Sequence, residues 1–181
     1  MNRLLITILV LASLSLNELA AQSNPAAEIS FTFNRQSGSA TNQFAVWIED
    51  AQGRHVKTLY ATRYTANGGY SRRETSIPRW VKQSGLAAMS RSQVDSITAA
   101  TPRAGSLSYT WDGTNAANAA LPPGNYTIYL EGTLRWENQV LYSAVIRLGQ
   151  GAAVPAVTTE YTGTPGAEAN MIENVRVRTL R

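Results

Sequence analysis

The sequence of 181 residues contains no cysteine, and this absence excludes several kinds of protein. Disulfides, thiolate metal centres and cysteine nucleophiles all require the missing side chain. An anchor attached through an acylated cysteine is excluded for the same reason. The fold must therefore be stabilised by the packing of its core, and a chain of this length suffices for one such domain.

Histidine is almost as scarce, because His55 is the only one. A metal centre built from several imidazoles is thus excluded, and a serine–histidine–acid triad would have to use His55 itself. The sequence contains no G-x-S-x-G motif to supply the nucleophile of such a triad. We expect no catalytic residue, no metal and no cofactor. A hydrolase or redox-accessory protein with an unrecognised site stays open as an alternative.

Long apolar runs are also rare. The run at residues 4–16 (LLITILVLASLSL) is too short for a membrane-spanning helix, which needs about 20 residues. Arg3 precedes this run and the small residues Ala20 and Ala21 follow it, as is typical of a secretory signal peptide. We therefore predict a signal peptide at residues 1–21, cleavage after Ala21 and no transmembrane anchor. Because small domains in many extracellular settings carry disulfides, their absence here favours the periplasm of a bacterium.

The chain carries a moderate excess of positive charge, formally +4 at pH 7. An exported basic protein meets anionic lipid headgroups, polysaccharides and acidic proteins before it meets nucleic acid. We therefore expect an envelope protein or an anionic envelope component as the partner, and no nucleic acid. The sequence leaves the oligomeric state open.

What the sequence does contain is a series of short β-strand patterns. After a linker at residues 22–27, large apolar side chains recur at every second position in residues 29–33, 44–48, 126–130 and 140–148. Further strands are expected at residues 54–62, 107–111, 157–161 and 171–179, from their content of β-forming residues. This count predicts one all-β domain at residues 28–181, an immunoglobulin-like antiparallel β-sandwich of about seven to eight strands.

Residues 63–104 interrupt this pattern and are expected to form a long insertion between strands. Within the insertion, Pro78 near a first turn and Gly85 after the last turn predict a short helix. For residues 90–98 (SRSQVDSIT), helical and extended conformations both remain open. Loops of this length are usually functional or disordered.

Two motifs carry a resemblance to a known family. Residues 50–59 (DAQGRHVKTL) predict a turn and a strand, and residues 111–115 (WDGTN) are followed by residues 121–126 (LPPGNY). The arrangement resembles a bacterial family of predicted periplasmic proteins of unknown function. It is also similar to the immunoglobulin-like module of the flagellar hook-capping protein, but the insertion fits only the periplasmic family. The resemblance implies a β-sandwich and says little about function.

Tryptophan and arginine mark the candidate binding surface. Trp47 and Trp111 fall on strands and are expected in the core. The other two tryptophans fall in expected loops beside arginines, and these residue types often dominate binding energy. The expected contact residues are Arg72, Arg73, Arg79, Trp80 and Trp136.

The leading hypothesis from the sequence is a non-catalytic accessory or binding protein of the periplasm. It rests on the absence of catalytic motifs and on the long insertion. Another hypothesis, from a different functional class, is that the protein is a structural subunit of an appendage, similar to the hook-capping protein.

Overall fold

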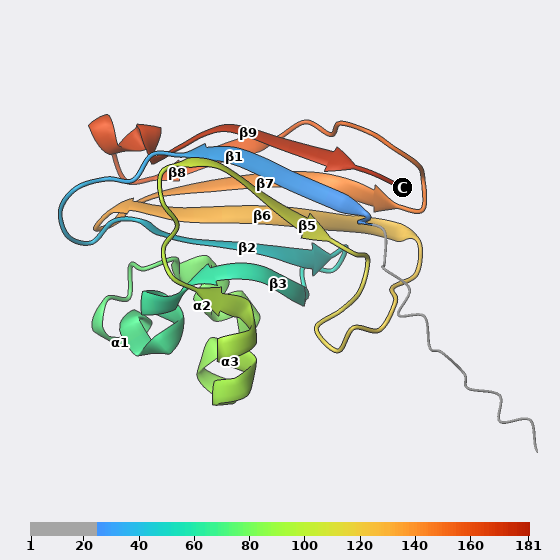
Figure 1. Ribbon diagram of the computed structural model, residues 1–181, viewed down its shortest axis with the longest axis horizontal. Helices are drawn as coiled ribbons and strands as arrows, with labels where there is room; N and C mark the ends of the chain where they lie inside the picture. The colour runs from blue at the N-terminus through green and yellow to red at the C-terminus, as the bar shows by residue number, and fades with distance from the viewer. Residues whose placement is uncertain (1–24) are drawn as a thin grey trace, which may run out of the picture.

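The computed structural model describes residues 25–181, and the predicted signal peptide lies outside them. Two β-sheets pack face to face as a sandwich, which confirms the predicted fold class (Figure 1). One sheet has three strands in the order β5-β1-β9, and the other has six in the order β4-β3-β2-β6-β7-β8. The strands are β1 (Ala27–Phe33), β2 (Gln43–Asp50), β3 (His55–Thr62), β4 (Thr98–Ala99), β5 (Gly105–Trp111), β6 (Gly124–Arg135), β7 (Asn138–Leu148), β8 (Thr158–Thr162) and β9 (Ile172–Thr179).

The core between the two sheets follows the period-two pattern of the sequence. Along β1, residues Ile29, Phe31 and Phe33 are buried and their neighbours are partly exposed. The expected hairpin of β6 and β7 is confirmed, with Ile128 paired to Ala144 and both side chains buried. Residues 25–181 contain nine strands rather than seven or eight, because β4 adds a two-residue strand that pairs in parallel with β3.

The insertion at residues 63–104 is ordered as short helices. The predicted helix is α2 (Pro78–Ser84), and Gly85 follows it in a left-handed conformation with φ of 65°. The undecided segment forms α3 (Arg91–Ile97), whose first turn is closed by reciprocal hydrogen bonds between Ser90 and Gln93. The remaining short helices are η1 (Thr65–Gly69), α1 (Tyr70–Arg72), η2 (Leu86–Ala88) and, outside the insertion, η3 (Ala167–Met171).

These helices cover the outer face of the six-stranded sheet, where they build a second core. Figure 1 shows α1, α2 and α3 gathered beside β2 and β3. Trp47 of β2 is fully buried there, together with Ile77, Trp80 and Leu86 of the insertion. The expectation that Trp47 lies in a core is therefore confirmed. The six-stranded sheet is the middle of three layers, with the small sheet on one face and the helices on the other.

A lysine joins the two motifs that carry the family resemblance. The Lys57 ammonium on β3 donates to the Asp112 carboxylate at 3.2 Å, to the Thr114 hydroxyl at 2.7 Å and to the Asn118 amide oxygen at 3.2 Å. Burial opposes the ionisation of Asp112, but the hydrogen bonds that its carboxylate accepts from Thr114 and Lys57 outweigh burial and hold its pKa below the usual range. The oxygen-rich turn after β5 is thus occupied by a cation of the protein itself.

No helix within residues 25–181 is long and apolar enough to cross a membrane.

Candidate functional site

The five residues expected to bind a partner lie in different surroundings. Arg72 is exposed at the end of α1, and Trp136 is 53% exposed at the β6–β7 hairpin. The guanidinium carbon of Arg73 lies 4.6 Å from the centre of the Tyr64 ring, a cation–π contact. Trp80 is fully buried, so the expectation that its side chain lies on an exposed loop is wrong.

The burial of Trp80 has a simple physical cause. Ala45 and Trp47 on the outer face of β2 are apolar and need a cover, and the insertion supplies Trp80 for that purpose. Its indole Nε1 donates to the Thr58 hydroxyl at 3.0 Å, so the polar atom is also satisfied. A side chain in this position contributes to stability and cannot contact a partner.

Arg79, one residue earlier, is the expected binding residue that the fold holds in a defined position. Its guanidinium carbon lies 4.5 Å from the centre of the Tyr129 ring, and that ring stacks on Trp47 at 5.0 Å. Its Nη2 is 3.7 Å from a Glu49 carboxylate oxygen. The Arg79 side chain remains 40% exposed, so a guanidinium of fixed orientation is accessible at the surface.

Two buried carboxyl groups support this arginine. Glu49 is 2% exposed and accepts a hydrogen bond of 2.8 Å from the indole Nε1 of Trp47. Glu131 of β6 is buried and accepts from the backbone N–H groups of Arg79 at 3.1 Å and Trp80 at 2.8 Å. Burial raises the pKa of Glu131 to about 7, although both backbone hydrogen bonds oppose the shift.

Glu131 takes the place of a conventional helix cap. The residue before α2 is Ile77, which lies in a left-handed conformation with φ of 43° and has no side-chain cap to offer. The first N–H groups of α2 would therefore be unsatisfied without an acceptor from elsewhere in the fold. A carboxyl group from the sheet fills this role, and it fixes the position of Arg79 relative to β6.

Arg79 lines a recess of about 210 Å³ between α2 and the edge of the six-stranded sheet. We call it the Arg79 recess. This volume is below the range of about 300–1,000 Å³ that is usual for drug-sized ligands, so it suits one small ring or the end of a chain. Its lining residues are Pro78, Arg79, Glu131, Gln139, Val140, Leu141, Glu160, Tyr161 and Thr162.

The chemistry of the recess is mixed in charge and rich in hydrogen-bonding groups. Arg79 and the amide of Gln139 can donate, whereas the carboxylate of Glu160 accepts. Tyr161 is 50% exposed and offers an aromatic face with a hydroxyl at its tip. The Nε–H group of Arg79 is buried and has no hydrogen-bond partner within the described residues.

One pattern in the sequence indicates that the outer face of β2 is covered. Residues 44–48 read Phe-Ala-Val-Trp-Ile, a continuous apolar run, which is typical of a strand buried on both faces. It indicates that some segment covers the face of Trp47. No comparable signal exists for Glu131, whose place in the alternation of β6 predicts an outward-facing polar residue.

His55 lies in a second recess, of about 270 Å³, between β3 and α3. Its Nε2 is 2.8 Å from the Thr58 hydroxyl, the same hydroxyl that accepts from Trp80. Burial lowers the pKa of His55. The ring is therefore part of a hydrogen-bonded chain that ends in the second core.

Together, the fold and the Arg79 recess define a β-sandwich protein in which an insertion covers one sheet and forms one wall of a polar recess. The chain belongs to the family described as "Predicted periplasmic protein (DUF2271)", whose model matches residues 26–164. The match spans the whole insertion and the strands from β1 to β8. It confirms the expected membership of a periplasmic family of unknown function, and nothing supports the similarity to the hook-capping module. No curated protein and no solved structure matches the chain.

Proposed function

We propose that this chain is a non-catalytic binding protein of the periplasm that recognises a saccharide unit of the envelope in the Arg79 recess. The observation that supports the proposal most directly is the fixed yet accessible guanidinium of Arg79, held by Tyr129 and Glu49. A preorganised side chain loses little conformational entropy when it binds.

The balance of charge in the recess favours a neutral ligand over an anionic one. Arg79 is a cation, but Glu49 lies beside it and Glu160 lines the same recess. An anionic group would meet these carboxylates as well as the guanidinium. A sugar hydroxyl both donates and accepts, so it matches a wall that contains donors and acceptors.

The non-catalytic part of the proposal rests on the surroundings of the titratable groups. The raised pKa of Glu131 has a structural explanation, because the carboxyl group lies under the start of α2 and accepts two of its N–H groups. His55 hydrogen-bonds to a threonine that serves the second core. The export expected from residues 1–21 and the family description both favour the periplasm.

Binding is tested with the chain that begins at Gln22, using a panel of soluble mono- and disaccharides in NMR titrations of the 15N-labelled protein. We expect a saturable ligand that shifts the amide signals of β8 and of the first turn of α2. Arg79→Met should weaken that ligand by at least about tenfold, equivalent to 1.4 kcal/mol. The matched control is Arg72→Met, which removes an exposed arginine away from the recess and should leave the affinity within about twofold.

Urea melts accompany the titrations, because Arg79 also covers Tyr129 and its loss could weaken the fold. The proposal fails if the folded Arg79→Met protein binds as tightly as wild type. It also fails if no saccharide of the panel shifts the signals of the recess.

A further inference from the structure

The strand β7 is paired along only half of one edge. β8 pairs with Gln139–Ser143 of β7, and within the described residues no strand pairs with 144–148 on that side. A strand rises about 3.3 Å per residue, so the uncovered edge extends for roughly 16 Å. Uncovered edges present backbone donors and acceptors that can pair with another extended chain.

The reason why β8 stops is visible in its register. Ser143 pairs with Thr158, so continuing the antiparallel register would place Val157 opposite Ala144 and Pro155 opposite Ile146. Proline has no N–H group to donate to such a ladder. The segment before β8 instead lies against the other sheet. There, Ala153 and Thr179 exchange two backbone hydrogen bonds of 3.0 and 2.8 Å.

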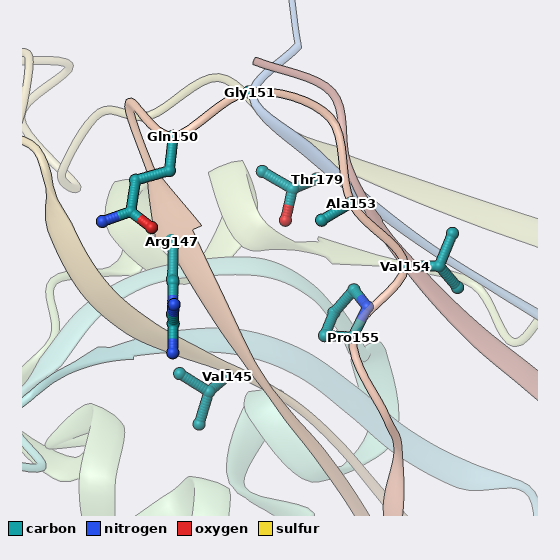
Figure 2. Close-up of a pocket in the computed structure, with 8 residues that line it drawn as sticks. All are labelled: Val145, Arg147, Gln150, Gly151, Ala153, Val154, Pro155 and Thr179. Carbon is teal, nitrogen blue, oxygen red and sulfur yellow. The ribbon is translucent and has the colours of Figure 1, made fainter.

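This detour leaves a groove of about 350 Å³ beside the free half of β7. Figure 2 shows Val145 and Arg147 on β7, Ala153 and Pro155 on the returning segment, and Thr179 near Ala153. Val145 is 53% exposed, and Val154, which also lines the groove, is 77% exposed. Arg147 is the one charged side chain in the lining of this groove.

We propose that an extended segment of a partner polypeptide adds to residues 144–148 of β7 as a strand. Backbone hydrogen bonds would provide affinity, and alternate apolar side chains of the segment would contact Val145 and Val154. A carboxylate of the segment would pair with Arg147, because the groove offers a cation and no acidic side chain. The site is separate from the Arg79 recess and does not depend on the function proposed for it.

The shape of the groove favours a single added strand over a second copy of this chain. The segment 153–155 bounds the groove on the side away from β7 and is fixed to β9. A second sheet that approached the β7 edge would meet this segment, whereas a single extended peptide needs only the space beside one strand.

A phage-displayed library of random heptapeptides, panned against the chain that begins at Gln22, supplies the probe. We expect enriched peptides with alternating apolar residues and an acidic residue or a free C-terminus. Synthetic copies should shift the amide signals of residues 144–148 and slow their hydrogen exchange. Arg147→Glu should weaken them by about tenfold or more, whereas Arg135→Glu, an exposed arginine at the far end of β6, should leave binding unchanged.

Two further variants test the edge itself. Val145→Lys places a charge on an edge position, a substitution that opposes strand addition, and should abolish binding while the exposed site preserves the fold. Pro155→Thr restores an N–H donor, so that the chain's own segment can pair with β7 and compete with the peptide. The proposal is overturned if enriched peptides bind elsewhere, if Arg147→Glu binds them normally, or if light scattering shows a wild-type dimer that Val145→Lys converts to monomer.

Discussion

At Glu131, one side chain shows how a local pattern and a tertiary environment can disagree. It follows Ile128 and Leu130 in an alternating strand, where an acidic residue is expected to face water. The insertion covers that face, so the carboxyl group is 3% exposed and is retained because α2 needs an acceptor. The sequence contains no signal for this pairing, since the two partners are separated by about fifty residues.

The raised pKa of Glu131 predicts a specific dependence of stability on pH. Because the pKa rises from 4.5 in the unfolded chain to about 7 in the fold, the contribution of this group to stability is fully present below pH 4.5 and is lost as the pH rises through 7. The loss from this one group should be roughly 3 kcal/mol, at 1.36 kcal/mol per pKa unit. Urea melts between pH 4.5 and 8 should show that fall in wild type and should lack it in Glu131→Gln.

Glu160→Gln is the matched control for that series, because it removes an exposed carboxylate from the rim of the same recess. It should keep the wild-type dependence on pH. A fall of equal size in Glu131→Gln and wild type would show that another group is responsible.

Among the secondary-structure elements, the spacing of the apolar residues predicted the positions of the strands well and the structure of the insertion poorly. Strands β1, β2, β6 and β7 lie where the period-two spacing of apolar residues placed them, because their inner faces all meet in the core between the two sheets. The helix at Pro78 was also predicted, from local signals for its start and end. The role of that helix was not predictable from the same signals, because they carry no information about which face of a distant strand it covers.

Trp80 and Trp136 were both predicted from the sequence to contact a partner. Their replacement tests whether Trp80 instead stabilises the second core. Trp80→Ala should reduce the free energy of unfolding by about 3–5 kcal/mol, the usual cost of emptying a large buried site. Trp136→Ala should change it by less than about 0.5 kcal/mol, because that side chain is half exposed at a hairpin. Urea melts of the two variants provide the comparison, and equal losses would contradict the layered arrangement of the second core.

In the whole molecule, the first strand, β1, holds the small sheet together. β1 is the central strand of the small sheet and pairs with β5 on one side and with β9, from the end of the chain, on the other. Many of the contacts that close the sandwich are therefore distant in sequence. Such a fold depends on β1, because the small sheet loses its central strand without it.

This arrangement predicts how far the start of the chain can be shortened. The backbone N–H of Ala26 donates to Trp111 at 2.6 Å, and its carbonyl accepts from Leu180 at 2.8 Å. A chain that begins at Gln22, as expected after cleavage behind Ala21, keeps both bonds and should unfold cooperatively in urea. A chain that begins at Ala27 should be less stable by about 1–3 kcal/mol, since each net hydrogen bond contributes about 0.5–1.5 kcal/mol. A chain that begins at Asn34 lacks β1 and should not fold, and equal stability of the first two chains would show that the linker extends through Ala26.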